Sequence, residues 1–252
     1  RSSDLWGGGT YSSRTAVLGG TAIALAADKV IDKGTGIAAH LLEAARADME
    51  FAAGEYKVAG TDRTVSFTEV ARAAYQPGKI PEGMEPGLME TATFDPGVPT
   101  FPNGAHVVEV EIDPDTGKTE ILKYSVVDDV GTVINKLTLE GQIHGGIGQA
   151  VGQTLSERIV YDESGQLITG SFLDYGMPRA DDMCSFDCAN NPVPTPVNPL
   201  GIKGAGEAGN VGGLAAIMNA VQDALAPAGV GHIDMPATPE KIWAAIQAAA
   251  NG

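Results

Sequence analysis

The feature that most constrains the fold is a pair of alternating segments separated by a tight turn. Residues 105–113 alternate apolar and polar side chains, and residues 119–128 resume the alternation after Pro114-Asp115-Thr116-Gly117. A period of two places successive side chains on opposite faces of a strand. The pattern therefore predicts an antiparallel hairpin, and the fold must contain a sheet.

Helical spacing dominates much of the remaining chain. Residues 14–53 are Ala-rich, and their spacing is interrupted near residues 33–36, which predicts two helices. Thr238-Pro239 has the residues favoured at the N-cap and first position of a last helix. Further helices are predicted at residues 68–75, 137–158 and 211–225.

Short strands are predicted at residues 55–59 and 64–67, and a second hairpin at residues 159–172 with its turn at 163–165. Residues 76–104 are rich in Pro and Gly, and residues 190–199 carry four prolines, so both segments are predicted to be irregular. The expected fold class is α+β, with mixed helices and antiparallel hairpins.

Composition excludes several classes of function. The chain has 252 residues and a net charge of −16, so phosphate backbones and anionic membranes would repel it. It has no run of about 18 apolar residues, so we expect no membrane span. Residues 16–27 lack the basic flank of a signal peptide. The expected location is the cytoplasm, with the periplasm as the alternative.

The two cysteines, Cys184 and Cys188, cannot complete a four-cysteine zinc or iron–sulfur site. We expect two reduced thiols in a loop and no metal ligand from this chain. His144 has no partner at ligand spacing, so a structural or supporting role is expected for it.

The segment Gly204-Ala205-Gly206-Glu207-Ala208-Gly209 matches the spacing of a dinucleotide-binding loop. That loop needs a hydrophobic strand before it, whereas residues 196–200 are irregular and Pro-rich. A carboxylate inside the loop would also repel a pyrophosphate. The glycine spacing is therefore only weak support for a nicotinamide-dependent enzyme.

Glu207 suggests a different role for the same loop. It precedes a predicted helix, whose dipole would favour the ionised carboxylate together with nearby Lys203, while desolvation would oppose ionisation. A carboxylate balanced in this way suits proton abstraction near neutral pH. The alternative is an ordinary solvated loop carboxylate.

Glycines crowd the predicted helix at residues 137–158, although each costs about 1 kcal/mol relative to Ala. They suggest that another backbone or a ligand approaches closely. Gln142, Gln149 and Gln153 share one helical face, so their amides could bind a polar, heteroatom-rich ligand. A tight helix-packing face with amides at its edge remains equally open.

The N-terminal loop at residues 5–13 is Gly-rich, and Thr10, Ser12, Ser13 and Arg14 lie at its end. Hydroxyls, backbone N–H groups and an Arg at a helix start can form an anion-binding site. The alternative is an ordinary helix cap supplied by Ser12 or Ser13.

Together these motifs resemble the molybdenum-binding subunit of the molybdenum hydroxylases, the family of xanthine dehydrogenase, aldehyde oxidoreductase and aerobic carbon monoxide dehydrogenase. The resemblance covers nearly the whole chain. It rests on the order of the segments at residues 9–14, 104–117, 141–149, 174–180 and 203–207, and on a tail with Ala216 to Val221 and Thr238-Pro239.

The resemblance implies the molybdopterin-binding fold over residues 1–252, as two intertwined α+β subdomains. It implies that Glu207 is the general base in oxidation of a C–H bond, with water as the oxygen source and an aldehyde or N-heteroaromatic compound as substrate. Gln142 would contact the pterin. Lys203, Gly204, Ala205 and Gly206 would line the cofactor.

The resemblance also assigns cofactor contacts to the N-terminal loop. Thr10, Ser12, Ser13 and Arg14 would hold the nucleotide phosphates of molybdopterin, commonly in its cytosine dinucleotide form. Val107 stands where some relatives have a cysteine near the pterin, so a thiol contact is absent there. Electrons would leave through 2Fe-2S clusters to FAD on partner subunits or domains.

The family's subunit is about three times longer than this chain, and the chain begins at Arg1 without an initiator Met. We therefore expect a C-terminal portion, either a fragment or one half of a split subunit. Its expected partners are the N-terminal portion, an iron–sulfur subunit and a flavin subunit. The alternative function is a non-catalytic assembly or interaction homologue with the same fold.

Overall fold

The computed structural model describes residues 9–251, so residues 5–8 of the predicted N-terminal loop lie outside the described part. Contacts divide the described chain into two compact units. Unit 1 comprises residues 9–17 and 98–251, and unit 2 comprises residues 18–97. Each unit has its own three-stranded sheet and its own hydrophobic core.

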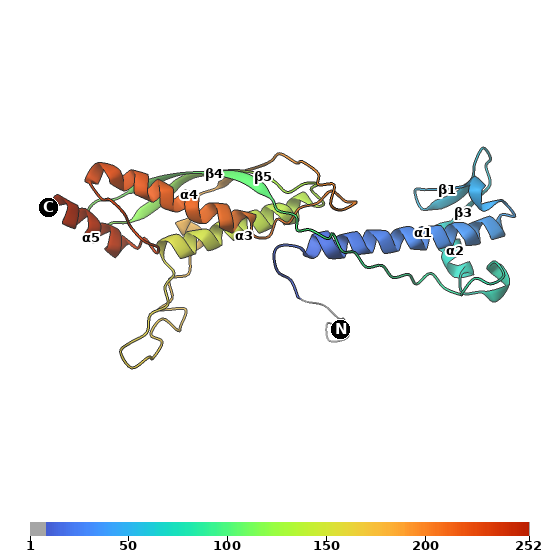
Figure 1. The fold of residues 1–252 in the computed structure, drawn as a ribbon, viewed down its shortest axis with the longest axis horizontal. Coiled ribbons are helices and arrows are strands. Elements are labelled where there is room, and N and C mark those ends of the chain that lie inside the picture. Colours follow the sequence, from blue (N-terminus) through green and yellow to red (C-terminus); the bar gives the residue numbers. More distant parts are fainter. Residues whose placement is uncertain (1–8, 252) are drawn as a thin grey trace. The chain divides into compact units, whose positions relative to one another are not determined.

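The predicted hairpin forms the sheet of unit 1 (Figure 1). Strands β4 (Asn103–Ile112) and β5 (Thr119–Asp129) pair antiparallel, with a register shift between Glu109 and Val110. Strand β6 (Phe186–Asn190) adds to β5 in the parallel direction, so this sheet is mixed. The parallel strand was not predicted, because a five-residue strand beside irregular segments carries a weak alternation signal.

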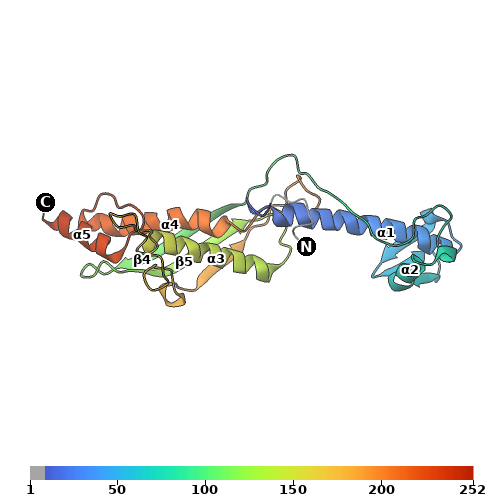
Figure 2. The same ribbon diagram turned by 90° about the horizontal axis from the view of Figure 1, so that it is seen from below.

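Two long helices lie side by side against the hairpin in both ribbon views (Figures 1 and 2). They are α3 (Lys136–Leu155) and α4 (Ala208–Leu225), and α5 (Pro239–Ala250) follows them. The buried core between helices and sheet includes Tyr124, Val126, Ile143, Ile147, Ile217 and Val221. Thr238 caps α5 by accepting a hydrogen bond from the Lys241 amide, as the sequence predicted.

Two glycines permit α3 and α4 to cross at backbone distance. A Cβ on Gly146 would lie 2.8 Å from the Asn210 backbone nitrogen, and a Cβ on Gly209 would lie 2.4 Å from the Ile143 carbonyl oxygen. Any larger residue would force the helices apart. The prediction that helical glycines mark a close approach of another backbone is confirmed at this crossing.

Two expectations for unit 1 need correction. The chain reverses at residues 163–165 as predicted, but only Tyr161 and Leu167 pair, as an isolated antiparallel bridge, so residues 159–172 form a shorter hairpin than predicted. Cys188 lies in β6 rather than in a loop, and both cysteines are free. Short 3-10 turns occur at Ala180–Asp182 and Ala226–Ala228.

Unit 2 contains a second small antiparallel sheet and two helices. The strands β1 (Met49–Ala52), β2 (Glu55–Val58) and β3 (Thr64–Ser66) pair in sequence order. The helices are α1 (Thr21–Leu41), which follows a π-helical turn at Ala16–Gly20, and α2 (Phe67–Ala73). Single 3-10 turns lie at Arg46–Asp48 and Pro77–Lys79.

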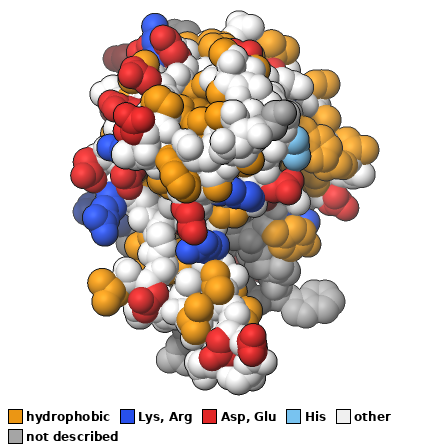
Figure 3. Space-filling model, turned by 90° about the vertical axis from the view of Figure 1, so that its left-hand side faces the viewer, with side chains coloured by type: hydrophobic (Ala, Val, Ile, Leu, Met, Phe, Trp, Pro, Cys, Tyr) orange, Lys and Arg blue, Asp and Glu red, His pale blue; other side chains and the backbone are white. Residues whose placement is uncertain are grey.

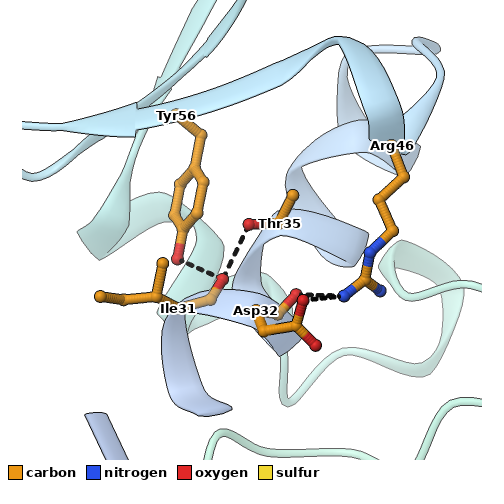
Figure 4. A network of polar contacts seen from close by, with 5 residues as sticks. All are labelled: Ile31, Asp32, Thr35, Arg46 and Tyr56. Carbon is orange, nitrogen blue, oxygen red and sulfur yellow. Dashed lines mark hydrogen bonds and ion pairs between the residues drawn. The ribbon is translucent and has the colours of Figure 1, made fainter. Parts of the chain in front are cut away.

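The sequence predicted two helices where unit 2 has one unbroken α1, and it missed β1. Gly34 does not end the helix, because it makes room for a buried tyrosine: a Cβ there would lie 2.1 Å from Tyr56 Oη. Figure 4 shows that Tyr56 and Thr35 both donate hydrogen bonds to the Ile31 carbonyl, at 3.3 and 2.9 Å. Arg46 binds Asp32 in the same network.

Acidic, basic and apolar side chains are interspersed on the face drawn in Figure 3. This mixture accords with an acidic chain rather than with the basic surface that nucleic-acid binding needs. None of the helices within residues 9–251 has both the length and the apolarity needed to cross a bilayer.

Candidate functional site

The N-terminal loop and the Glu207 loop meet in unit 1 although 194 residues separate them. Ser13 Oγ donates a hydrogen bond to Glu207 Oε2 at 2.8 Å and accepts one from the Glu207 amide at 3.0 Å. A Cβ on Gly204 would lie 2.9 Å from the Ser13 Cβ. The Gly-rich motif is therefore needed for close loop contact.

The meeting of the loops corrects the helix-cap expectation. Ser12 and Ser13 adopt positive φ values of 53° and 52°, which non-glycine residues adopt rarely. The Ser13 hydroxyl is occupied by Glu207, so it does not cap the helix that follows. Such strain is typical of functional loops that their surroundings hold in place.

The Gln142 segment joins the same place. A Cβ on Gly206 would lie 3.4 Å from both Gln142 Oε1 and Ser13 Oγ. All three sequence motifs therefore converge. Gln149 and Gln153 are exposed further along α3 and line neither of the two cavities described next. His144 packs edge-on against Phe186, with ring centroids 5.3 Å apart, which is a structural role.

We call the place where Ser13, Gln142 and Glu207 meet the convergence point. Two cavities flank it, and we name each after one lining residue. The Gln142 cavity has a volume of about 490 Å³, and its polar lining includes Thr10, Ser13, Thr132, Asn135, Gln142 and Lys203. The Glu207 cavity has a volume of about 380 Å³, and its polar lining includes Ser12, Ser13, Asn103, His106, Asp128 and Glu207. Ala205 and Gly206 line the first cavity.

Lys203, which was predicted to lie near Glu207 and favour its ionised form, is paired with Asp129 instead. The Lys203 ammonium forms a short ion pair with Asp129 Oδ2, and both side chains are largely buried. Burial raises the pKa of Asp129, but hydrogen bonds from Lys203 and from the Val193 and Gly131 amides outweigh it and lower that pKa to about 2. The pair holds the Lys203 ammonium at the wall of the Gln142 cavity, with its charge balanced by Asp129.

Glu207 occupies the N-cap position of α4 and is exposed. The positive end of the helix dipole lies at its backbone, which favours a negative charge there. With Lys203 engaged elsewhere, the Ser13 hydroxyl is the group that orients the carboxylate.

Arg14 keeps unused hydrogen-bonding capacity in the N-terminal loop. Its guanidinium carbon lies 3.7 Å from the centroid of the Tyr11 ring, and its buried Nε has no partner among the described residues. Thr10 is engaged locally, since its hydroxyl accepts a hydrogen bond from the Thr15 hydroxyl at 2.9 Å.

Val107 lies away from the convergence point. It is 68% exposed, and the alternation of β4 turns it to the face opposite the helices. It lines neither cavity. The structure therefore does not bring Val107 together with the other residues selected from the sequence.

Comparison with known sequences decides the family. The sequence-family model for the molybdopterin cofactor-binding domain matches residues 2–184 of the chain. The chain belongs to this molybdopterin cofactor-binding family. Glu207 lies beyond the matched residues, so its role rests on the geometry above and on the resemblance in sequence.

Relatives of this molybdopterin-binding chain are subunits of oxidoreductases. It is 41% identical to the gamma subunit of the 6-hydroxypseudooxynicotine dehydrogenase complex of Paenarthrobacter nicotinovorans, over 96% of this chain and 30% of the relative. It is 37% identical to the large chain of carbon monoxide dehydrogenase of Hydrogenophaga pseudoflava, over 96% of this chain and 30% of the relative.

Solved structures agree with the α+β fold class. Carbon monoxide dehydrogenase from Oligotropha carboxidovorans superposes with a TM-score of 0.90 and 36% identity, over 98% of this chain and 31% of that chain. Quinoline 2-oxidoreductase from Pseudomonas putida 86 superposes with a TM-score of 0.87 and 42% identity, over 96% of this chain and 31% of that chain. The chain thus spans about a third of the length of the relatives it matches.

The residues at the convergence point fit a molybdopterin cofactor. Such a cofactor is rich in heteroatoms and carries phosphate, so it needs hydrogen-bond donors and positive charge. The Gln142 cavity offers the Gln142 amide, threonine hydroxyls and the fixed Lys203 ammonium. The unpaired buried Arg14 Nε is a further donor without an acceptor.

Several polar groups around the two cavities were not predicted from the sequence, among them Asp129, Asn135, His106 and Asp128. The pair Asp128-Asp129 at the end of a predicted strand was the available signal, because two adjacent acids interrupt an apolar alternation. Nothing in the sequence identified which element would cover them.

Proposed function

We propose that this chain is the cofactor-binding part of the catalytic subunit of a molybdenum hydroxylase, with Glu207 as its general base. The observation that carries the proposal is the convergence of Ser13, Gln142 and Glu207 beside two largely apolar cavities with a few polar groups in their walls. In this proposal residues 1–252 are one molybdopterin-binding domain, and the two compact units are its subdomains.

The residues of the Gln142 cavity would hold the cofactor. Gln142 would bind the pterin, and Lys203 with the loop at Gly204 to Gly206 would line it. Thr10, Ser12 and Arg14 would bind phosphate of a cytosine dinucleotide form, and Ser13, whose hydroxyl is engaged by Glu207, would contribute through its backbone N–H. The bound cofactor supplies the redox chemistry, since it accepts two electrons from the substrate. Within residues 9–251, no group of three or more His, Cys, Asp or Glu side chains is arranged to hold a metal.

As the proposed general base, Glu207 accepts on its carboxylate the proton released when water supplies its oxygen to the substrate. Ser13 donates to Oε2, which leaves Oε1 free to face the cavity and receive a proton. The N-terminus of α4 stabilises the carboxylate before transfer. The strained Ser12-Ser13 backbone keeps this orientation fixed.

The proposed substrate and partners rest on the resemblance in sequence, and the names of the relatives support them. The proposed reaction oxidises a C–H bond of an aldehyde or N-heteroaromatic compound, with water as the oxygen source; one relative is named as a nicotine 6-hydroxylase large subunit. The proposed partners are the remainder of the molybdenum subunit, a 2Fe-2S subunit and an FAD subunit. The proposed location is the cytoplasm, with the periplasm as the alternative.

The test is Glu207→Gln in the assembled complex, measured as turnover of an N-heteroaromatic substrate together with molybdenum content. An amide cannot accept the proton, so we expect turnover to fall by about 100-fold or more while molybdenum content is unchanged. Glu111→Gln, an exposed residue of β4, is the matched control.

Unchanged turnover in Glu207→Gln would refute the assignment of the base. A complex that contains no molybdenum would refute the proposed function as a whole and would favour the assembly or interaction homologue.

A further inference from the structure

Apolar side chains form much of the wall of the Glu207 cavity. Phe101 and Pro102 come from the segment that enters β4, and Val211 comes from the first turn of α4. Phe101 and Val211 are each 69% exposed. A single exposed apolar side chain is ordinary, but an aromatic ring and a branched aliphatic side chain in the wall of one cavity indicate a binding surface for an apolar group.

Val211 lies on the same side of α4 as Glu207. The two residues are four apart, and the Val211 amide donates a hydrogen bond to the Glu207 carbonyl at 3.0 Å, so their side chains lie one helical turn apart on one face. Ser13, which binds the Glu207 carboxylate, lines both cavities. The apolar wall therefore adjoins the proposed base on one side, and the proposed cofactor cavity lies just beyond that base.

The most buried part of the lining consists of side chains that bind each other. His106 Nδ1 lies 2.7 Å from Tyr124 Oη, and His106 Nε2 lies 3.6 Å from Asp128 Oδ1. The side chains of His106 and Asp128 are only 5% and 2% exposed. A Cβ on Gly212 would lie 2.4 Å from His106 Nε2, so the imidazole fits because this residue is glycine. The base of the cavity is thus closely packed, and the surface open to a ligand is the apolar wall.

We propose that the Glu207 cavity is the substrate site and that Phe101 selects planar aromatic substrates by packing against their ring. This inference rests on the proposed function, and it favours N-heteroaromatic compounds over aliphatic aldehydes. Two aromatic rings attract each other in offset-stacked or edge-on arrangements beyond the effect of the area that they bury. An aliphatic aldehyde has no ring face to offer to Phe101.

The size and the polar groups of the cavity suit an N-heteroaromatic compound. Its volume of about 380 Å³ is within the range of small-molecule sites. Ser12 and Asn103 line the same cavity, and their side chains can donate a hydrogen bond to a ring nitrogen. An apolar wall with a few polar groups is typical of sites that bind a ring and fix its orientation.

The test measures equilibrium binding of two cyclic amides to the assembled complex by isothermal titration calorimetry. Quinolin-2-one is flat and already oxidised at the carbon next to its nitrogen, so it binds without turnover. Piperidin-2-one has the same cyclic amide but no aromatic face. We expect the unmodified complex to bind quinolin-2-one about tenfold or more tightly than piperidin-2-one. Phe101→Ala should weaken quinolin-2-one binding about tenfold and change piperidin-2-one binding by less than about twofold.

Three further variants sharpen the test. Phe101→Leu keeps an apolar side chain but removes the ring, so it should give an intermediate loss of quinolin-2-one affinity. Phe172→Ala is the matched control, because Phe172 is an exposed aromatic residue of unit 1 that lines neither cavity. It should bind both compounds as the unmodified complex does. Glu207→Gln should lose turnover but still bind quinolin-2-one, because the apolar wall is intact.

Equal affinities of the unmodified complex for the two compounds, or an unchanged quinolin-2-one affinity in Phe101→Ala, would refute the inference. If Glu207→Gln is inactive in the same experiments, the proposed function still stands. A lower yield of assembled complex in Phe101→Ala with unchanged quinolin-2-one affinity would show that Phe101 packs against the remainder of the subunit, which also refutes the inference. A complex without molybdenum that keeps the Phe101-dependent binding would instead refute the proposed function and leave the cavity as a site for aromatic ligands.

Discussion

The two units differ in how many of their buried side-chain polar atoms lack a hydrogen-bond partner. In unit 2 the buried Tyr56 hydroxyl has its partner, the Ile31 carbonyl, and the start of α2 is closed by a capping box between Ser66 and Glu69. Six buried side-chain polar atoms within residues 9–251 lack a partner, and five of them belong to unit 1. These five are Arg14 Nε, Thr119 Oγ1, Asp128 Oδ2, Asn190 Oδ1 and Asn210 Oδ1.

The difference indicates that unit 2 is stable by itself, whereas unit 1 is arranged to bind a further group. An unpaired buried polar group costs about 1–3 kcal/mol, so folded chains satisfy nearly all of them. Unit 2 does so with one exception, Thr21 Oγ1. Of the five atoms in unit 1, Asp128 Oδ2 belongs to a residue that lines the Glu207 cavity, and Arg14 follows Ser13, which lines both cavities.

The largest expected effect on stability comes from the helix crossing of unit 1. Gly146→Val would drive a side chain into the α4 backbone at Asn210, and we expect the free energy of unfolding to fall by about 3 kcal/mol. Gly145→Ala is the matched control: nothing lies within 4 Å of its new Cβ, and a gain of up to ~1 kcal/mol is expected. Thermal unfolding measures both; equal stabilities of the two variants would refute the close crossing.

A pH-dependent effect should follow from the Asp129 pair in unit 1. The folded-state pKa of about 2 lies below the ordinary 3.8, so the pair contributes stability above about pH 4 that is lost as pH falls toward 2. Asp129→Asn should therefore be less stable than the unmodified protein at pH 5, and this gap should close in acid. A gap that is independent of pH would contradict the pairing of Asp129 with Lys203.

The smallest effect concerns unit 2 and sharpens the contrast. Ser66→Ala removes the side-chain acceptor for the Glu69 amide, 3.2 Å away, and should cost about 1 kcal/mol. Thr68→Ala, an exposed neighbour in α2, should be neutral or slightly stabilising. Molybdenum content of the assembled complex should be the same in both. A loss of molybdenum in Ser66→Ala would show that unit 2 is not a separate scaffold.

Local patterns in the sequence sufficed for most elements that are regular over many residues. The alternation at residues 105–128 predicted β4 and β5, and Thr238-Pro239 predicted the start of α5. The predictions failed where packing overrides local preference: Gly34 lies inside α1 because Tyr56 needs the space. They also failed at β6, whose pairing partner is distant in sequence.

The sequence by itself determined the order of the motifs, their residue types and the family, because these depend on short-range spacing. Only the tertiary structure decided which groups meet: Ser13 with Glu207, Lys203 with Asp129, and His106 with Asp128 and Tyr124. The physical reason is that these contacts depend on how closely the backbones of distant segments can approach. Gly146, Gly204 and Gly209 set that approach, and their effect emerges only once the segments are packed.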